Sequence, residues 1–397
     1  MIVDTSPANA RYGERTDLLA LVRRLDWLLL LAVGTLVAYG LWAVGGITRF
    51  DVAGNQDYYV VRQGIAAALG AACLLIAIFI DPDAYRRSWK ALYIGTVSLM
   101  VLVFALAEAN RGSKRWIELG PFQFQPSEFG KLLFVLALAG FLADRARRLG
   151  EVRTVLTCVG LGLLPMLLVF KQPDIGTSLV YAAALAAVLF VAGARWTHLA
   201  ALASVGVLAI VSVLWLLPAA GVEVLEPYQK ARLTGFTNPA EDPAGLTYNV
   251  SQSITAVGSG GFDGRGVAEA TQTRLDYLPE HATDFVFASF AEQRGFAGAA
   301  ILLLLYLLVV WRGLRVVTVA RDQFAATVAG GIVVAFLFQV FVNVGMTMGI
   351  APVTGIPLPF VTVGGSSMVA NLLAIGVLQA IHARGATATA PALRSRR

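Results

Sequence analysis

Residues 27–46 read WLLLLAVGTLVAYGLWAVGG, a run of apolar and small side chains without a charge. A helix needs about 20 consecutive apolar residues to cross the hydrocarbon core of a bilayer. The run is too long for the apolar region of a cleavable signal peptide, and no convincing small-residue cleavage site follows it. We therefore predict that Trp27–Gly46 is a transmembrane helix, preceded by an N-terminal tail over residues 1–26.

Nine more apolar runs follow along the chain. They cover Val60–Ile80, Trp89–Ala107, Phe129–Ala143, Thr154–Phe170, Gly176–Ala194, Leu199–Leu217, Phe285–Trp311, Phe324–Gly349 and Ser366–Ile381. Phe129–Ala143 is short for a crossing, so we expect its helix to begin earlier, within residues 125–128. Together the ten runs predict an all-α integral membrane protein with a single ten-helix membrane domain over residues 27–384.

The composition agrees with a chain whose main solvent is lipid. Hydrophobic residues make up 57% of it and charged residues 14%, with a mean hydropathy of +0.70. Soluble domains carry about 25% charged residues. The net charge of +6 would suit nucleic acid, but its distribution indicates membrane orientation instead, so we expect no nucleic-acid partner. Cys73 and Cys158 lie in apolar runs, which indicates neither a disulfide framework nor a cysteine metal cluster.

The arginines distinguish the two sides of the predicted bundle. The short loops Asp81–Ser88 and Asp144–Arg153 are rich in arginine, as cytoplasmic loops usually are. If both are cytoplasmic, most of the 31 lysines and arginines lie on the inner side, and both termini do as well. The tail Gly385–Arg397 is small, polar and basic, and we expect it to be disordered.

Two segments on the outer side stand apart. One is the loop Glu108–Ser127, and the other is a large loop over residues 218–284, between the seventh and eighth helices. Apolar residues such as Tyr248, Ile254 and Phe262 recur through the large loop, so we predict that it folds as a cap on the outer face. We find no internal repeat, so the inverted-repeat signature of many transporters is missing.

The position of the charges favours a site at the outer edge of the membrane. The middles of the ten runs contain no Asp, Glu, Lys or Arg, whereas a proton or ion pathway would place ionisable groups near the midplane. A site that acts on a lipid head group would place them near the outer ends of the helices. The charges found there are Arg49, Arg62, Glu108, Lys114, Arg115, Glu128, Lys131, Lys171, Asp174, Asp284, Glu292 and Arg294.

Two of these outer-edge groups have a structural and a functional interpretation. Glu128 and Lys131 are three residues apart, so on a helix they share a face and can pair. The pair is either a structural ion pair, or Lys131 meets an anionic head group while Glu128 fixes its side chain. Arg115-Trp116 is either part of the site or an anchor, because both residue types favour the membrane interface.

Three further segments are rich in glycine or proline. Gln172–Gly176 is expected to form a turn in which Asp174 caps the next helix. The glycines of 258–266 lack the features of a phosphate-binding loop and indicate only unusual backbone geometry. The prolines of 351–362 exclude a helix, and Gly364–Ser367 opens the last helix either as an anion site or as a plain re-entrant turn.

The segment Pro279–Phe285 lies where the large loop re-enters the membrane. In the structural interpretation Thr283 or Asp284 caps the helix that follows, whose N-terminus favours an anion. In the functional interpretation the Asp284 carboxylate is a general base held at the membrane edge.

Taken together, these motifs resemble those of the SEDS family (shape, elongation, division and sporulation), which includes RodA and FtsW. The resemblance runs in order from Arg62-Gln63 to Asn371. The matching segments are Lys114–Gly120, Phe124–Lys131, Gln172–Thr177, Gln252-Ser253, Gly258–Gly261, Thr271-Gln272, Leu278–Glu280, Thr283–Phe285, Asn343, Pro352–Phe360 and Gly364–Ser367.

The resemblance implies a ten-helix fold with a large outer loop after the seventh helix. It also implies an inverting glycosyltransferase that polymerises lipid II into glycan strands for cell elongation and shape, releasing undecaprenyl pyrophosphate. The reaction would take place at the outer face of the bacterial cytoplasmic membrane. Asp284 falls on the family's catalytic aspartate, and Glu128 and Lys131 match its pair at the start of the fourth helix.

The resemblance also implies the substrate, the partner and the binding residues. Besides lipid II and its undecaprenyl-linked glycan, we expect a membrane-bound class B penicillin-binding protein, a transpeptidase, as partner. No cofactor is indicated, although a divalent cation, Mg²⁺ or Mn²⁺, could share the binding of pyrophosphate. The expected substrate-binding residues are Arg62, Arg115, Trp116, Glu128, Lys131, Lys171, Gln172, Asp174, Gln252, Ser253, Thr283, Ser366 and Ser367.

The sequence departs from the family pattern close to Asp284. The family usually has a histidine directly before the Thr-Asp pair, where this chain has Ala282 and carries His281 one position earlier. Ala270 also replaces a usual glycine. Features that look more like RodA than FtsW are Asp81–Asp83, Tyr228-Gln229, Phe236, Asn238-Pro239 and Gly264–Gly266.

Three alternatives to this reading remain open at this point. The chain could be a division- or sporulation-type paralogue with the same activity. It could be a flippase for lipid II, although the uncharged helix middles count against that. It could also be an inactive scaffold that recruits the transpeptidase.

Overall fold

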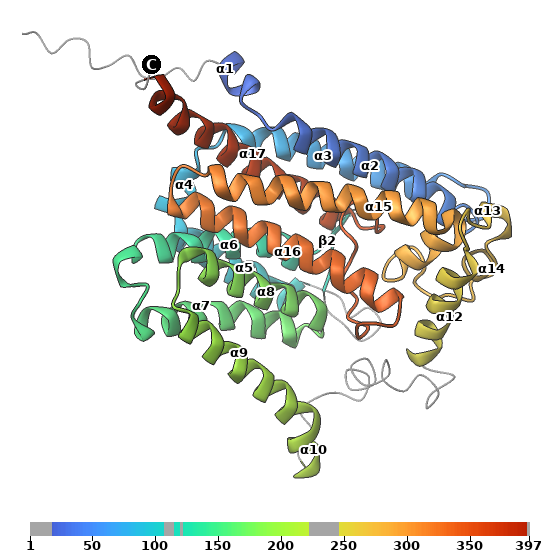
Figure 1. Ribbon diagram of the computed structural model, residues 1–397. Coiled ribbons are helices and arrows are strands. Elements are labelled where there is room, and N and C mark those ends of the chain that lie inside the picture. Colours follow the sequence, from blue (N-terminus) through green and yellow to red (C-terminus); the bar gives the residue numbers. More distant parts are fainter. Residues whose placement is uncertain (1–17, 107–114, 120–121, 222–245, 395–397) are drawn as a thin grey trace, which may run out of the picture.

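The computed structural model describes residues 18–106, 115–119, 122–221 and 246–394. Ten of its helices are long and apolar enough to cross a membrane, as predicted, and they run side by side in one bundle (Figure 1). They are α2 (Trp27–Ile47), α3 (Tyr58–Phe79), α5 (Trp89–Leu106), α6 (Pro126–Ala143), α7 (Val152–Lys171), α8 (Ile175–Ala192), α9 with α10 (Trp196–Ala219), α15 (Val286–Val319), α16 (Gln323–Thr347) and α17 (Gly365–Arg394).

The ends of several helices follow from single residues. Aspartates accept a hydrogen bond from the first turn of the helix at α2, where Asp26 binds the Leu29 N–H at 3.0 Å, and at α16, where Asp322 binds the Ala325 N–H at 2.9 Å. Such caps satisfy N–H groups that have no partner within the helix. Pro126 begins α6, which confirms that this helix starts before Phe129.

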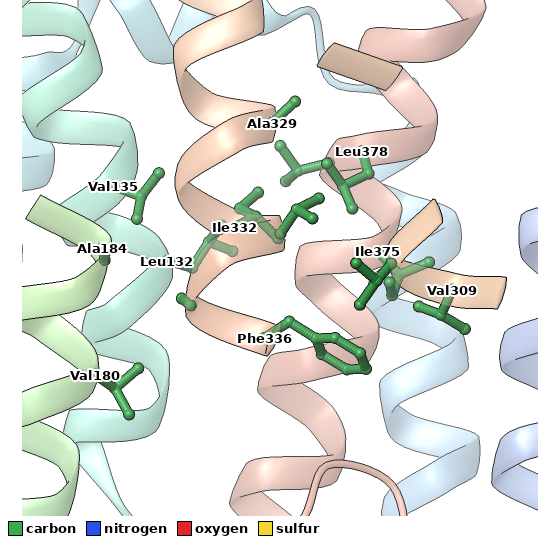
Figure 2. Packing of buried hydrophobic residues seen from close by; sticks show 14 of the residues in the cluster. Leu132, Val135, Val180, Ala184, Val309, Ala329, Ile332, Phe336, Ile375 and Leu378 are labelled. Atoms are coloured by element: carbon green, nitrogen blue, oxygen red, sulfur yellow. The ribbon is translucent and has the colours of Figure 1, made fainter. Parts of the chain in front are cut away.

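The centre of the bundle is formed by α6, α8, α16 and α17. In α6 and α17, 78% of the residues in the membrane-spanning window are buried, compared with 17% in α5. Figure 2 shows how Leu132 and Val135 of α6 lie beside Ile332 of α16, with Ile375 and Leu378 of α17 close by. These buried side chains hold the elements on which the site is built.

Glycines allow α3 and α17 to approach each other closely. A Cβ atom added at Gly376 would lie 2.5 Å from the Leu74 carbonyl oxygen, and one added at Gly70 would lie 2.6 Å from Leu372. Small residues at such crossings are the usual means of packing helices in a bilayer, where water does not drive them together.

The seventh crossing differs from the others. It was predicted over Leu199–Leu217, and it begins at Trp196 as α9 (Trp196–Val211), passes through one π-helical turn and ends as α10 (Leu217–Ala219). None of the residues in its apolar window is buried, and in Figure 1 it diverges from the bundle. A helix that meets lipid on all sides is expected to be apolar all round.

Much of the described non-helical chain lies at one end of the bundle, the end that the sequence predicts to face outward. This end is called the outer end below, and the opposite end is called the inner end. A hairpin that the sequence reasoning did not predict pairs β1 (Ile117–Leu119) with β2 (Phe122–Phe124), with Glu118 opposite Gln123. In the described part of the predicted cap, α12 (Leu246–Ser259), α13 (Gly266–Glu269) and α14 (Thr271–Arg274) pack on α15. Glu108, Lys114, Tyr228, Gln229, Phe236, Asn238 and Pro239 lie outside the described residues.

The inner end holds both ends of the described chain. Two short helices, α1 (Leu18–Arg23) and α4 (Pro82–Arg87), lie there, and the last turns of α17 emerge at the same end (Figure 1). The last helix α17 runs on past Gly385, where the tail was predicted to begin, and ends at Arg394. Alanine, which recurs in this stretch, has the highest helix propensity.

Candidate functional site

Asp284 lies half-buried at the outer end of the bundle, immediately before α15. The helix starts at Val286, and its cap residue is Phe285, so neither Thr283 nor Asp284 occupies the cap position that the structural interpretation gave them. Instead the Thr283 hydroxyl donates to the Glu280 carboxylate at 2.9 Å, and Glu280 itself has a positive φ of 56°. Asp284 is thus carried by a turn of irregular backbone at the membrane edge.

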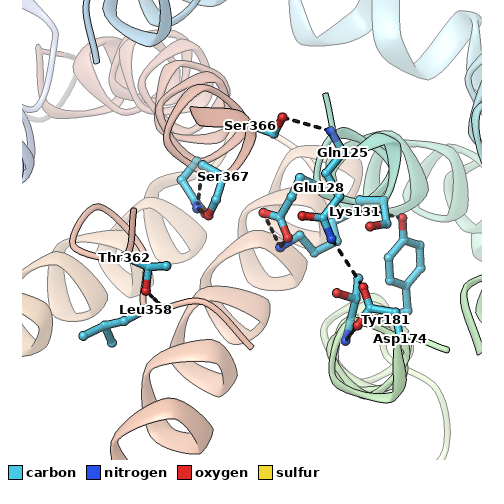
Figure 3. Close-up of polar contacts among 12 residues, drawn as sticks. Gln125, Glu128, Lys131, Asp174, Tyr181, Leu358, Thr362, Ser366 and Ser367 are labelled. Atoms are coloured by element: carbon cyan, nitrogen blue, oxygen red, sulfur yellow. Dashed lines mark hydrogen bonds and ion pairs between the residues drawn. The ribbon is translucent and has the colours of Figure 1, made fainter. Parts of the chain in front are cut away.

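Glu128 and Lys131 form the predicted ion pair at the start of α6. The Lys131 ammonium donates to both carboxylate oxygens at 2.8 and 2.9 Å (Figure 3). Glu128 is 1% exposed and Lys131 8%, so the charges are almost removed from solvent. Charges so buried must be paired, because desolvation would otherwise cost several kcal/mol for each ion.

The pair closes the polar end of a largely apolar cavity between α6, α15, α16 and α17. The cavity has an empty volume of about 590 Å³, including the space at its open mouth. Gln339 of α16 also lines it, and the Gln339 Nε2 atom is buried without a hydrogen-bond partner among the described residues. A cavity of this kind, apolar with a few polar groups, fits a ligand with a charged head and an apolar tail.

The start of α17 is joined to the hairpin beside this pair. The Ser366 hydroxyl donates to the Gln123 carbonyl at 2.7 Å and accepts from the Gln125 N–H at 2.9 Å (Figure 3). Ser367 accepts from the side chain of Asn371. Both serines lie close to the Glu128–Lys131 end of the site, but both hydroxyls already bond within the protein.

Three other predicted binding residues hold the turn between α7 and α8. The Arg115 guanidinium donates to the carbonyls of Gln172 and Pro173. The Gln172 side chain donates to the Met100 carbonyl at 2.9 Å, and Asp174 caps α8 by accepting from the Thr177 N–H at 3.0 Å. Gln172 and Asp174 are each 2% exposed. Their hydrogen bonds therefore support the backbone of the α7–α8 turn from inside the protein.

The remaining predicted binding residues are spread more widely. Ser253 of α12 is fully buried and donates to the Thr347 carbonyl at 2.8 Å, while Gln252 beside it and Trp116 are half-buried. Arg62 and Lys171 are exposed at the outer ends of α3 and α7. Arg62 donates to the Tyr58 hydroxyl at 2.6 Å. Among the predicted binding residues, the exposed cations Arg62 and Lys171 are the most accessible to an anionic group in the solvent.

The glycine-rich segment docks against a kink in α15. Gly261, Gly264 and Gly266 have positive φ angles, as the sequence indicated, and at Gly264 a Cβ would lie 2.4 Å from the Gln293 carbonyl oxygen. Glu292 is fully buried there and accepts from the N–H groups of Gln272 and Thr273 and from the Thr273 hydroxyl. Glu292 therefore anchors the cap and is not available to substrate.

His281 makes a contact that the sequence reasoning missed. Its Nε2 atom lies 3.1 Å from a carboxylate oxygen of Asp51, in the loop between α2 and α3, and its Nδ1 atom lies 3.5 Å from Asp276. Burial lowers the pKa of His281, but the hydrogen bond and charge of Asp51 and the charge of Asp276 raise the pKa by more, so it lies above its usual value. The His281 ring thus ties the Asp284 turn to the loop between α2 and α3.

In the described part of the chain, few side chains that could bind a metal ion lie close together. Across residues 18–106, 115–119, 122–221 and 246–394, no group of three or more His, Cys, Asp or Glu side chains converges as a metal site would require. A divalent cation would therefore have to take most of its oxygen ligands from a bound phosphate, as Mg²⁺ often does.

Comparison with known proteins gives matches over nearly the whole chain. A family model described as cell cycle protein, covering FtsW, RodA and SpoVE, matches residues 22–386. Stage V sporulation protein E of Bacillus subtilis is 36% identical over 354 residues, covering 88% of this chain and 93% of that protein. Peptidoglycan glycosyltransferase MrdB of Escherichia coli is 36% identical, covering 89% and 92%. Probable peptidoglycan glycosyltransferase FtsW of Halothiobacillus neapolitanus is 37% identical, covering 90% and 86%.

Solved structures agree with the sequence matches. A chain of a peptidoglycan synthase complex, whose description concerns the coordination of polymerization and crosslinking, matches with a TM-score of 0.77 at 30% identity. That match covers 91% of this chain and 98% of the other. Thermus thermophilus RodA matches with a TM-score of 0.66 at 28% identity, covering 90% and 96%.

We expect Glu128→Gln to destabilise the protein more than a double change to Glu128→Gln with Lys131→Met. The single change leaves a buried ammonium without its counter-charge, which costs about 3–5 kcal/mol, whereas the double change removes both charges. Thermal unfolding of the purified protein in detergent checks this order. Equal melting temperatures for the two variants would show that the pair is not electrostatically coupled.

We expect the stabilising effect of His281 to be lost as the pH rises. Because the pKa of His281 is raised in the folded protein, its contribution is fully present below the unfolded value of about 6.5 and disappears as the pH passes the folded value. The measurement compares the melting temperatures of wild type and His281→Gln between about pH 5.5 and 9. A difference that stays constant over this range would contradict the pairing with Asp51.

Proposed function

Because the chain belongs to the FtsW, RodA and SpoVE family of cell cycle proteins, we propose that it polymerises lipid II into glycan strands. It is a multi-pass membrane protein and a peptidoglycan glycosyltransferase. The observation that carries the proposal for the site is the position of Asp284, a half-buried carboxylate on irregular backbone at the outer end of the bundle. The Glu128–Lys131 pair, at the start of α6, lies at the same end of the bundle and lines the cavity.

The proposed reaction is a displacement at the anomeric carbon of the donor sugar. The 4-hydroxyl oxygen of the acceptor sugar forms a bond to that carbon from the face opposite the pyrophosphate, so the configuration inverts. The bond between the carbon and the pyrophosphate oxygen breaks, and the undecaprenyl pyrophosphate leaves with the electron pair. Asp284 accepts the hydroxyl proton, which requires it to lie within about 3 Å of the hydroxyl, directly or through one water.

The leaving pyrophosphate needs positive charge nearby. Lys131 lines the cavity and is held in place by Glu128, and Arg62 and Lys171 are exposed at the outer ends of α3 and α7. Arg115 contributes through the α7–α8 turn that it holds. A cation such as Mg²⁺ or Mn²⁺, bound mainly by the pyrophosphate itself, would add charge without needing a preformed protein site.

The membrane and partner assignments follow from the same relationship. We place the site on the outer face of the bacterial cytoplasmic membrane, with both termini in the cytoplasm, because arginine-rich loops lie at the other end of the bundle. A class B penicillin-binding protein is the proposed partner, supported by the likeness to a chain of a peptidoglycan synthase complex. The relatives Stage V sporulation protein E, MrdB and FtsW match at similar identity. The proposed elongation role therefore rests on the RodA-like motifs of the sequence.

We expect Asp284→Ala and Asp284→Asn to lose about 10²- to 10⁴-fold in polymerisation rate, the usual contribution of a general base. The assay follows glycan strands made from labelled lipid II by the purified protein with its transpeptidase partner, with and without EDTA. Asp263→Asn is the matched control, because Asp263 is an exposed aspartate of the same outer cap. Full activity of Asp284→Asn would exclude the base assignment, and lipid scrambling without polymerisation would favour a flippase.

We expect single cysteines on the two sides of the bundle to react differently with a membrane-impermeant maleimide. In a protein whose Cys73 and Cys158 are replaced by serine, Asp263→Cys should be labelled from the outside and Arg148→Cys only after the membrane is opened. Both positions are exposed, so accessibility within the protein does not limit the reaction. The reverse pattern would overturn the proposed orientation.

A further inference from the structure

Three consecutive backbone carbonyls at Asp284 accept hydrogen bonds from parts of the chain that are distant in sequence. The Ala282 carbonyl accepts from the Val363 N–H at 3.0 Å, and the Thr283 carbonyl accepts from the Thr362 hydroxyl at 3.2 Å. The Asp284 carbonyl accepts from the Asn343 side chain at 3.0 Å. All three donors come from α16 or from the non-helical segment 351–364 that follows it.

Thr362 is the centre of this arrangement. Its side chain is buried, and its hydroxyl both donates to the Thr283 carbonyl and accepts from the Leu358 N–H at 2.8 Å (Figure 3). A hydroxyl has a single hydrogen, so accepting from Leu358 directs that hydrogen toward Thr283. Thr362 therefore joins the turn of its own segment to the turn that carries Asp284.

Two buried amides fix the same segment from either side. Gln63 of α3 donates to the Thr362 carbonyl at 2.9 Å and accepts from the Gly364 N–H at 3.1 Å. Asn343 of α16 uses its amide group for the carbonyls of Asp284 and Ile356, at 3.0 and 2.8 Å. Buried amides bonded in this way allow few other positions, because breaking one bond leaves an unsatisfied polar group.

The segment also leads directly to the other half of the site. Two residues after Gly364 it has become the first turn of α17, where Ser366 bonds the hairpin at Gln123 and Gln125. Pro126 follows at once and starts the helix that carries Glu128 and Lys131. Residues 362–366 thus form a hydrogen-bonded connection between Asp284 and the Glu128–Lys131 pair.

We propose that Thr362 is a positioning residue for the transfer reaction, and that Asn343 and Gln63 support it. Through the backbone of residues 282–284 they set where the Asp284 carboxylate stands relative to Lys131. The inference rests on the proposed role of Asp284 as general base. Asp284 precedes the first turn of α15, so the helix does not fix its position, and a catalytic group displaced by about 1 Å can lose about 10²-fold in rate.

A matched pair of isosteric variants tests the proposal. Thr362→Val removes the hydroxyl that binds the Asp284 turn and keeps the shape of the side chain. Thr327→Val makes the same change in α16, where the buried Thr327 hydroxyl donates only to the Gln323 carbonyl one turn earlier. Each variant is prepared as the full chain with its transpeptidase partner, and kcat, KM and lipid II binding are measured together with the melting temperature.

The expected result is a loss of about 10- to 100-fold in kcat for Thr362→Val, with KM and lipid II binding within about threefold of wild type. Thr327→Val should keep kcat within about twofold of wild type. Thr362→Ser restores the hydroxyl and should recover most of the kcat. A purely structural role would instead lower activity in proportion to the loss of folded protein.

Two further variants keep the outcome decisive. Asn343→Ala should lower kcat in the same way, and adding Thr362→Val to Asp284→Ala should cause no further loss, because both changes act on one step. Equal kcat values for Thr362→Val and Thr327→Val, with Asp284→Ala inactive, would overturn the positioning role and leave the proposed function intact. An active Asp284→Ala protein would remove the base and the positioning role together.

Discussion

The constraint on which this structure depends is that a bilayer offers no hydrogen-bond partner to the backbone. Through the membrane the chain is therefore helical, and three of its irregular segments lie together at the end predicted to face outward, where they bond to one another. The hairpin β1–β2, the turn before α15 and the segment 351–364 are joined through Ser366, Thr362 and Asn343. Irregular backbone is tolerated there because it is enclosed by protein, and that enclosure forms the site.

The same constraint explains why several buried charges are bonded within the protein. Glu292 accepts three hydrogen bonds within the cap, and Asp174 caps a helix, so each carboxylate is used in holding the fold. Lys131 is paired with Glu128, but the pair faces a cavity and can exchange part of its interaction for a bound anion. Asp284 is half-buried on the turn immediately before α15, a turn that it shares with Glu280.

His281 shows how a departure in sequence can be accommodated by the fold. The family pattern places a histidine directly before the Thr-Asp pair, and in this chain Ala282 stands there. The Ala282 carbonyl is bonded to Val363, while the ring one position earlier reaches Asp51 in another loop. The shift therefore provides an additional tie between two outer loops and leaves the register of Thr283 and Asp284 unchanged.

The sequence by itself determined the ten crossings, the pairing of Glu128 with Lys131 and the turn in which Asp174 caps the next helix. These features are local, because apolar run length, helical spacing and turn chemistry need no distant partner. Only the tertiary structure decided that Gln172 and Ser253 bond inward, that β1 and β2 pair, that α17 continues to Arg394, and that Thr362, Asn343 and Gln63 hold the Asp284 turn. Gln63 and Thr362 are 299 positions apart, and no pattern of spacing predicts such a contact before the helices are packed.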